Sequence, residues 1–493
     1  VVKGSLWTLA GQVAPIAFSF VATPFTIRLL GAEGYGVLIL VGLIPSYLGF
    51  ADFGMGLGST KFASEAYAAG DGEREARIVR TAALIAFLAS LPLGIAIFLL
   101  SGWIVTLFNM PGHLLGEAST ALKFGAVTFV VNFLNGIFNT PQLTRLRMDL
   151  NTLVGFVPRV LGIVAVPIVI YLGGGIVGAT AVLMAASLLT LAGHVYTSNR
   201  LLPGLTDLTI DRAVVRPLLK FGSGLVVGGV AAVMLVNLEK LVLARVTSVE
   251  VLAYYSVAFN FAMMATMFSA AMLQSLIPAF SQLMTADRRE QLNGLFSRAL
   301  RMNIIGILPI LTGLFVIARP LFTIWAGPDF GRESTLPFYI LLGGLFFNLV
   351  AHVPVSLLMA AGRTDMVAKL YWVELFPYLA LIAVLTWRFG AVGAAAAWSI
   401  RVCADAIVMA VLAGRAVGLS FRVFKGKRTN LAVAFLVLAP PLIVAASTAA
   451  FPVWLVFLLA ASLGAYALLA WKKFLEADER TWFFGRLAAI VGR

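Results

Sequence analysis

The 493-residue chain has few charged side chains, a single cysteine and only three histidines. Only 12% of its residues are Asp, Glu, Lys or Arg, whereas about 25% are charged in soluble domains. This scarcity, together with a hydrophobic content of 61%, excludes a soluble enzyme and a disordered chain. Cys403 cannot form a disulfide within one chain, and His113, His194 and His352 are too scattered to indicate a zinc site.

The chain also lacks the sequence motifs of several enzyme classes. No G-x-x-x-x-G-K-[ST] run occurs, so the chain carries no P-loop and does not itself hydrolyse ATP. No Ser/His/Asp or Cys/His arrangement stands out. The connections predicted to be external hold few acids, mainly Asp329 and Glu333, whereas a membrane enzyme of glycan assembly needs acidic residues on a sizeable external loop. Enzyme activity is therefore disfavoured.

Long apolar runs fill most of the chain and predict an all-α polytopic membrane protein. A spanning helix needs about 20 mostly apolar residues, and no segment alternates with the period of two that membrane strands show. Gly173, Gly174 and Gly175 predict a tight turn between two spans, and Gly54 and Gly58 predict close helix packing. Apolar runs between charged or Gly/Pro-rich breaks predict fourteen spans: 5–27, 36–60, 78–100, 120–142, 152–172, 176–197, 219–242, 252–279, 295–317, 335–360, 366–387, 391–414, 430–449 and 452–471.

The basic residues orient these spans. With the N-terminus in the cytoplasm, most of the 36 Lys and Arg residues fall in cytoplasmic segments, as the positive-inside rule requires. The formal net charge of +14 therefore indicates membrane topology, with both termini cytoplasmic, rather than binding of nucleic acid. The external connections hold Arg28, Lys240, Arg245, Arg319, Arg332 and Arg388, and the spans themselves hold Lys123, Arg159 and Arg401.

The two halves of the chain form an internal repeat with an offset of about 216 residues. The matches include Pro92 with Pro309, Arg147 and Asp149 with Arg363 and Asp365, and Gly175 with Gly390. Each repeat has six spans, an even number, so we expect two parallel lobes related by a pseudo-twofold axis along the membrane normal. The predicted organisation is an N-lobe (1–200), a C-lobe (217–416), two further helices (430–471) and an amphipathic cytoplasmic tail (476–493).

Ionisable side chains inside or at the ends of spans are the candidate substrate-binding residues, because such groups are costly in a membrane and are usually functional. Arg28 fits a snorkelling anchor at the membrane interface equally well. Asp52 could bind a cation, titrate or pair with Lys61. The candidates are Arg28, Asp52, Lys61, Lys123, Arg159, Lys240, Arg245, His352, Arg401 and Asp405.

Further alternatives apply to the other candidates. An interfacial ion pair with Glu239 explains Lys240 better than a binding role does. Arg401 and Asp405 lie one helical turn apart, and could either neutralise each other or bind a ligand. Asn132, Asn135 and Asn139 form a polar stripe along one predicted span, for which interhelical hydrogen bonds are favoured over ligand contact.

The first 80 residues resemble a known family. The runs PFTIRLLGAEGYG (24–36), ADFGMGLGSTK (51–61) and AGD (69–71) resemble the polysaccharide (Wzx-like) flippases of the multidrug/oligosaccharidyl-lipid/polysaccharide exporter superfamily, which share the plan of six, six and two helices. The resemblance implies a transporter of polysaccharide biosynthesis in a bacterial or archaeal cytoplasmic membrane. Its implied substrate is an undecaprenyl-diphosphate-linked oligosaccharide, moved from the cytoplasmic to the external leaflet by alternating access.

The resemblance also implies that basic residues on the first, second, seventh and eighth helices face a cavity, and Arg28, Lys61, Lys240 and Arg245 occupy comparable places. We expect no cofactor; an ion gradient of H⁺ or Na⁺, or downstream consumption of the product, would supply energy. Expected partners are the lipid-linked oligosaccharide, membrane lipids and other glycan-assembly proteins, and not nucleic acid. The alternatives are a multidrug or organic-cation antiporter of the same superfamily, centred on acids such as Asp52, Glu239 and Glu374, and a glycan-assembly enzyme.

Overall fold

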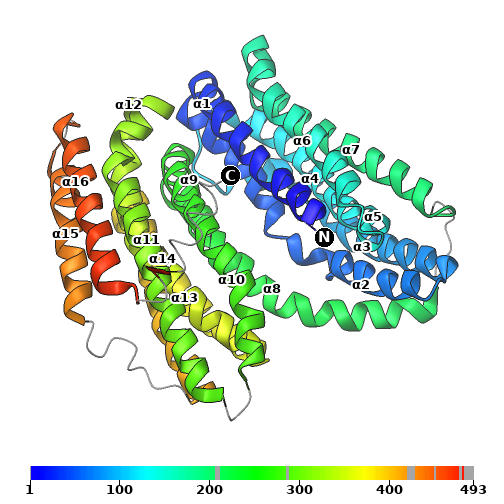
Figure 1. Cartoon of the computed structure of the whole chain (residues 1–493). Coiled ribbons are helices and arrows are strands. Elements are labelled where there is room, and N and C mark those ends of the chain that lie inside the picture. The colour runs from blue at the N-terminus through cyan, green and yellow to red at the C-terminus, as the bar shows by residue number, and fades with distance from the viewer. Residues whose placement is uncertain are drawn as a thin grey trace. The chain divides into compact units, whose positions relative to one another are not determined.

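The computed structural model describes residues 2–205, 211–284, 288–418, 428–448, 451–476 and 480–481. These residues are almost entirely helical and include no strand (Figure 1). The chain divides into two compact units: unit 1 is Val1–Tyr254 with Thr386–Gly390, and unit 2 is Tyr255–Leu385 with Ala391–Arg493. The amphipathic tail predicted at 476–493 lies almost wholly outside the described residues.

Unit 1 contains the N-terminal helices of the chain. In chain order they are α1 (Val2–Ser46), α2 (Met55–Ala68), α3 (Gly72–Thr106), α4 (Leu115–Phe138), α5 (Thr140–Thr144), α6 (Met148–Val169), α7 (Gly175–Leu201) and α8 (Arg212–Val246), followed by the first residues of α9 (Val249–Met264).

Unit 2 contains the rest of α9 and the helices that follow it. They are α10 (Thr266–Gln282), α11 (Arg289–Ala326), α12 (Pro328–Glu333), α13 (Thr335–Ala360), α14 (Thr364–Val417), α15 (Arg428–Ser447) and α16 (Trp454–Leu469).

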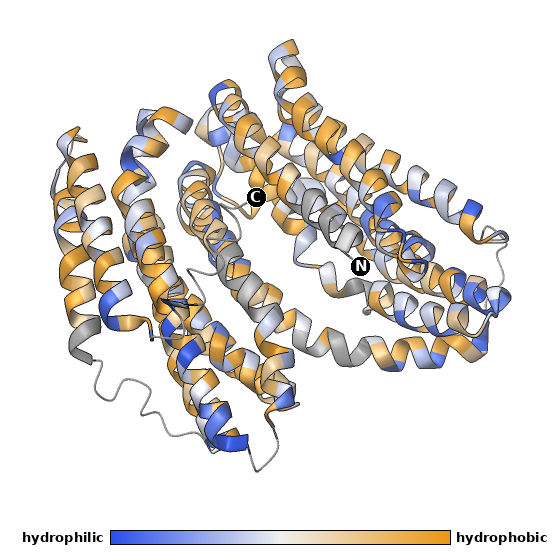
Figure 2. Cartoon of the chain, in the orientation of Figure 1, coloured by the Kyte–Doolittle hydropathy of each residue, from blue (hydrophilic) through white to orange (hydrophobic). Residues whose placement is uncertain are grey.

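The helices have the length and composition of membrane spans. Eight described segments are long and apolar enough to cross a membrane, and Met148–Leu201 and Thr364–Val417, each of 54 residues, both contain two of the predicted spans. Figure 2 shows hydrophobic residues along most helices and hydrophilic residues gathered near many helix ends. The prediction of an all-α polytopic membrane protein is confirmed. Most predicted spans coincide with helices; the exceptions are 36–60, 120–142, which Asn139 interrupts between α4 and α5, and 252–279, which Ala265 interrupts between α9 and α10.

The first of these exceptions is a break after the end of α1. Phe53 (φ 49°) and Gly54 (φ 66°) adopt left-handed backbone conformations before α2 starts at Met55. The expected continuous helix over 36–60 is therefore wrong, and Gly54 lies at the start of α2 rather than on a helix face. Gly58 does allow close packing, because a Cβ atom there would lie 3.2 Å from the Leu218 side chain of α8.

The internal repeat has the same local structure in both halves. Gly175 (φ 54°, ψ −151°) and Gly390 (φ 55°, ψ −131°) reverse the chain between successive spans in nearly the same conformation, which side chains with a Cβ rarely adopt. Where the preceding helices begin, Arg147 pairs with Asp149 at 2.9 Å and Arg363 pairs with Asp365 at 3.9 Å. The sequence matches thus correspond to matched turns and helix starts.

Helices within unit 1 pack closely through small residues. α3 packs on α4, α4 on α7, and α6 on both α7 and α1. A Cβ atom at Gly94 would lie 2.7 Å from Val130, and one at Gly162 would lie 2.9 Å from Ala186. Glycine at these two crossings therefore permits a backbone approach that a side chain would block.

In unit 2 the C-terminal hairpin of α15 and α16 packs on α11. The Tyr466 hydroxyl donates to the Ile305 carbonyl oxygen at 2.9 Å, and the Arg301 guanidinium lies 2.7 Å from the Glu476 carboxylate. Near the other end of α11, Arg319 donates to the Thr448 carbonyl oxygen at 3.4 Å. The hairpin is therefore attached near both ends of α11.

Candidate functional site

Two lysines of unit 1 contact aromatic rings. The Lys61 Nζ of α2 lies 5.0 Å from the ring centroid of Phe62 and 4.9 Å from that of Phe221 in α8. The Lys123 Nζ of α4 lies 5.7 Å from the Phe98 ring of α3. Aromatic faces attract a cation without cancelling its charge. Among the side chains that the structure describes, no carboxylate forms an ion pair with either lysine.

Arg159 has no described partner that compensates its charge. It lies midway along α6 (Met148–Val169) and its side chain is exposed on unit 1. Within the described part of the chain, no ion pair or hydrogen bond joins its guanidinium to another residue. A charge at this depth of a membrane helix is tolerated where it faces a water-filled cavity or a binding partner.

Arg28 borders an apolar groove between α1 and α6. The groove has a volume of about 490 Å³ and is lined by Arg28 together with apolar residues such as Phe25, Val164 and Ile168, and by Tyr171. Arg28 is exposed and lies just before Gly31, where α1 bends. An apolar wall beside a guanidinium suits a lipid that carries a phosphate.

The charged residues of α8 lie near its C-terminal end. Glu239 is fully buried, and Lys240, itself largely buried, donates to the Asn237 Oδ1 atom at 2.8 Å. The Tyr47 hydroxyl donates to the Asn237 carbonyl oxygen, which ties this stretch of α8 to the end of α1. Arg245 is exposed in the last turn of the helix.

Arg401 and Asp405 belong to a buried charge cluster in unit 2. The Arg401 guanidinium lies 3.4 Å from the Glu374 carboxylate and 5.4 Å from the Tyr378 ring, and all of these residues are on α14. Asp405 is buried close to both Glu374 and Arg401, and its Oδ1 atom has no hydrogen-bond partner among the described residues. The sequence placed Arg401 and Asp405 on one helix face, but the ion-pair partner of Arg401 is Glu374, across the Gly390 turn.

The last two predicted residues, His352 and Asp52, belong to no described cluster of charged side chains. His352 is half-buried in α13, and its Nδ1 atom has no hydrogen-bond partner among the described residues. The side chain of Asp52 lies outside the described residues. Within the described residues, no group of three or more His, Cys, Asp or Glu side chains could hold a metal ion.

The structure distributes the predicted residues over both units. Arg401 and Asp405 meet in one cluster of unit 2, and His352 lies elsewhere in the same unit. The candidates in unit 1 are spread over five helices, with Lys240 and Arg245 both on α8, and no ion pair or hydrogen bond joins them to one another among the described side chains. They are Arg28, Lys61, Lys123, Arg159, Lys240 and Arg245.

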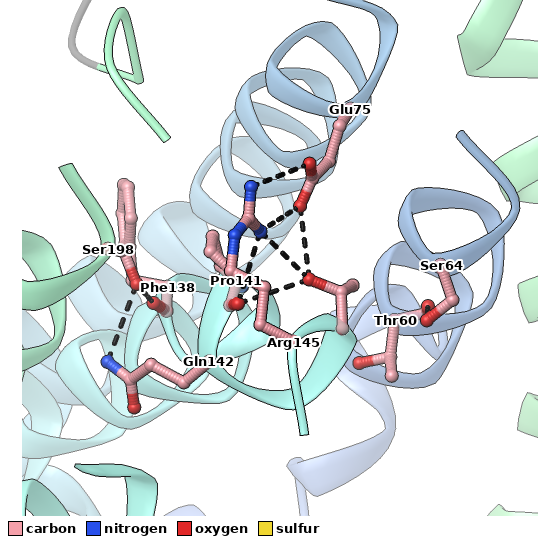
Figure 3. Close-up of polar contacts among 9 residues, drawn as sticks. Thr60, Ser64, Glu75, Phe138, Pro141, Gln142, Arg145 and Ser198 are labelled. Atoms are coloured by element: carbon pink, nitrogen blue, oxygen red, sulfur yellow. Dashed lines mark hydrogen bonds and ion pairs between the residues drawn. The ribbon is translucent and has the colours of Figure 1, made fainter. Parts of the chain in front are cut away.

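A buried ion pair in unit 1 was not predicted from the sequence. Arg145, directly after α5, binds Glu75 of α3 through two hydrogen bonds, at 2.6 and 3.0 Å, and Figure 3 shows its guanidinium directed at that carboxylate. Thr144 also donates to Glu75 at 3.1 Å, and the guanidinium lies 4.7 Å from the Tyr67 ring of α2. The polar run TPQLTR (140–145) between two apolar spans is the signal that marks this contact.

The amino-acid sequence of this chain is similar to those of known proteins. A family model described as polysaccharide biosynthesis protein matches residues 1–284, more than half of the chain. A candidate O-antigen transporter of Shigella flexneri is 24% identical over 412 residues, which cover 83% of this chain and 96% of that protein. The lipopolysaccharide biosynthesis protein WzxC of Escherichia coli (strain K12) is 30% identical over 185 residues, covering 37% of this chain and 36% of WzxC.

Solved structures share the fold at low sequence identity. A multidrug resistance MATE family transporter of the MOP superfamily, in an inward-facing conformation, matches with a TM-score of 0.68 at 15% identity, over 83% of this chain and 96% of that chain. The lipid II flippase MurJ, in an inward closed conformation, matches with a TM-score of 0.67 at 14% identity, over 95% and 98% respectively. On its sequence match and with this transporter fold, the chain belongs to the polysaccharide biosynthesis protein family.

Proposed function

We propose that the chain is a flippase that moves a lipid-linked oligosaccharide from the cytoplasmic to the external leaflet by alternating access, in polysaccharide biosynthesis. Its family, its similarity to an O-antigen transporter and its MurJ-like fold support this proposal. The substrate class is an oligosaccharide on undecaprenyl diphosphate. Neither the sugars nor the diphosphate can cross hydrocarbon unaided, because desolvating such polar groups is costly.

The observation that carries the proposal is the set of uncompensated cations in unit 1. Arg159 and Lys123 lie on helices long and apolar enough to cross a membrane, Lys61 lies on α2, and no described carboxylate pairs with any of them. A diphosphate would supply the missing negative charge, and arginine is suited to bind its oxygens with two hydrogen bonds at once.

The same distribution disfavours an organic-cation antiporter, which would need acids available to its cargo. Glu75 is bound by Arg145, and Glu374 is paired with Arg401. In the groove between α1 and α6, an apolar wall and the Arg28 guanidinium occur together, as recognition of a lipid phosphate requires. The α2 and α4 lysines and Arg159 of unit 1, for which no described carboxylate is a partner, thus suit an anionic lipid.

The remaining features of the proposal follow from topology and from the relatives. We place the protein in a bacterial or archaeal cytoplasmic membrane with both termini in the cytoplasm, acting without catalysis. Energy would come from a gradient of H⁺ or Na⁺, or from downstream consumption of the flipped product. Other proteins of glycan assembly would supply and consume the substrate.

Purified protein in liposomes tests the proposal. The probe is a fluorescent undecaprenyl-diphosphate-linked oligosaccharide, and flipping is measured as the rate at which an impermeant quencher gains access to it. We expect flipping well above that of protein-free liposomes, and a fall of roughly ten- to a hundredfold in Arg159→Gln, because a charge-assisted bond to the diphosphate is lost. Arg159→Lys should keep more activity than Arg159→Gln.

Arg147→Gln is the matched control, because Arg147 is exposed and already paired with Asp149 at the start of the same helix. It should flip the probe at the normal rate. A wild-type protein that flips no faster than empty liposomes would overturn the proposed function. Normal flipping by Arg159→Gln would instead remove Arg159 from the mechanism.

A further inference from the structure

A second pocket of unit 1 lies between α1, α4 and α7. Its volume is about 370 Å³, within the range of small-molecule sites. The polar side chains that line it are neutral: Ser46, Thr128, Asn132 and Thr180, with Phe129 and Phe133 beside them. None of the described residues that line this pocket is charged, so its chemistry differs from that of the cations described above.

The amide of Asn132 is held in one orientation. The Ser187 hydroxyl of α7 donates to the Asn132 Oδ1 atom, and the Asn135 amide donates to the same atom at 3.4 Å. Asn135 also donates to the Ser187 carbonyl oxygen at 3.3 Å. With its oxygen engaged, Asn132 has two N–H donors left. Neither donates to a described residue, and the exposed side chain lines the pocket.

The hydroxyl groups of the pocket are available as hydrogen-bond acceptors rather than as donors. Ser46 donates to the Leu43 carbonyl oxygen at 2.6 Å, Thr128 to Phe124 at 2.9 Å and Thr180 to Ile176 at 3.1 Å. Each hydroxyl has thus used its proton on its own helix, which leaves the oxygen lone pairs as acceptors. The pocket therefore offers donors from Asn132 and acceptors from these three oxygens.

Two aromatic rings complete the pocket. Phe129 and Phe133, one turn apart on α4, meet edge to face with their centroids 4.7 Å apart. They add apolar contact area next to the hydrogen-bonding groups. A ring whose hydroxyl groups both donate and accept, and whose carbon skeleton is apolar, matches all of these features.

We propose that this pocket binds one neutral sugar ring of the transported glycan, an inference that rests on the proposed function. Among the described residues of the lining, a phosphate finds no cation and an organic cation finds no carboxylate. The diphosphate and the sugar are thus recognised at different places in unit 1: the diphosphate by cations such as Arg159, and the sugar between α1, α4 and α7. Asn132 is the main donor to the sugar hydroxyls.

Binding to full-length protein in lipid nanodiscs tests this inference. The probes are undecaprenyl diphosphate without sugar and the same lipid carrying one N-acetylglucosamine, glucose or galactose. The measured quantity is the ratio of the dissociation constant of the bare lipid to that of the sugar-bearing lipid. We expect a ratio above one for at least one sugar, and a three- to tenfold lower ratio in Asn132→Leu, because a neutral hydrogen bond is lost.

The controls separate this inference from the proposed function. Asn139→Leu changes the same residue type on the same stripe but outside the pocket, and should leave the ratio unchanged. Thr128→Val keeps the side-chain shape and removes one hydrogen-bond acceptor, so it should also lower the ratio. It replaces Asn132→Leu as the test if that variant does not fold. All three variants should bind the bare lipid with the wild-type constant.

Two results would overturn the inference. One is bare-lipid binding with no added affinity from any sugar, and the other is a full sugar contribution in both Asn132→Leu and Thr128→Val. Either result leaves the proposed function in place. Failure of the wild-type protein to bind even the bare lipid would count against the proposed function itself.

Discussion

Arg401 and Glu374 form an ion pair across the turn that divides α14. Their side chains are only 10% and 11% exposed, and the Asp405 carboxyl lies beside Glu374. Two carboxylates so close repel each other unless a proton or a cation intervenes, and Arg401 supplies the cation. The pair therefore links the two spans of α14 and offsets part of the carboxylate charge inside unit 2.

This arrangement predicts that Arg401 acts mainly on stability. Arg401→Ala leaves two buried carboxyls without their cation and should lower the free energy of unfolding by about 3–5 kcal/mol. The double variant Arg401→Gln/Glu374→Gln should be more stable than Arg401→Ala alone. Thermal denaturation in detergent measures both. Stable, well-folded Arg401→Ala protein that has lost glycan export would contradict this prediction and favour a substrate-binding role.

Glu75 and Arg145 should be the more critical of two ion pairs in unit 1. The Glu75 side chain is 0% exposed and that of Arg145 is 16% exposed, so Glu75→Ala should cost about 3–5 kcal/mol by leaving an unpaired buried guanidinium. Arg147→Ala breaks a pair whose side chains are 48% and 38% exposed, and should change stability little. Equal losses of unfolding free energy in the two variants would argue against a stabilising role of the buried pair between α3 and the end of α5.

The two turn glycines should respond alike to substitution. Gly175→Ala and Gly390→Ala each force a side chain into a conformation that glycine alone adopts readily, at a cost of about 1–3 kcal/mol. Gly136→Ala is the matched control, because Gly136 lies within α4 and a Cβ atom there meets nothing within 4 Å. It should be neutral or stabilising by about 0.5–1 kcal/mol. Unfolding midpoints that do not separate the control from the turn variants would refute this prediction.

Arg28 should contribute to substrate affinity and little to folding. Arg28→Ala should insert normally and weaken binding of undecaprenyl diphosphate in nanodiscs by roughly three- to tenfold, since its guanidinium borders the groove between α1 and α6. Arg28→Lys should recover part of the affinity, because lysine keeps the charge and loses the planar pair of donors. Wild-type affinity in Arg28→Ala would assign this residue to the membrane interface alone.

The fold was largely predictable because membrane helices follow local rules. Apolar runs located the spans, and the run of three glycines correctly predicted the turn between α6 and α7. The repeat correctly matched Gly175 with Gly390. The sequence misplaced the break near Gly54, because a left-handed residue at a helix start and a glycine on a helix face look alike in an apolar run.

The site was less predictable because its contacts join distant residues. Glu374 and Arg401 are separated by a turn, and Glu75 and Arg145 by two helices, so spacing rules could not pair them. The stripe of Asn132, Asn135 and Asn139 was expected to make interhelical hydrogen bonds, and Asn132 and Asn135 do so with Ser187 of α7. Only the structure shows which amide atoms these bonds leave available for a ligand.

The attachment of α15 and α16 to α11 has a practical consequence. Tyr466 and Glu476 contact one end of α11, and Thr448 contacts the other. The hairpin and the rest of unit 2 should therefore move as one rigid body. A spin label on the exposed Phe457 position of α16 would therefore move with that unit. Paired with a label on the exposed Leu189 position of α7, it would yield a distance distribution that tests whether the two units move relative to each other when substrate is added.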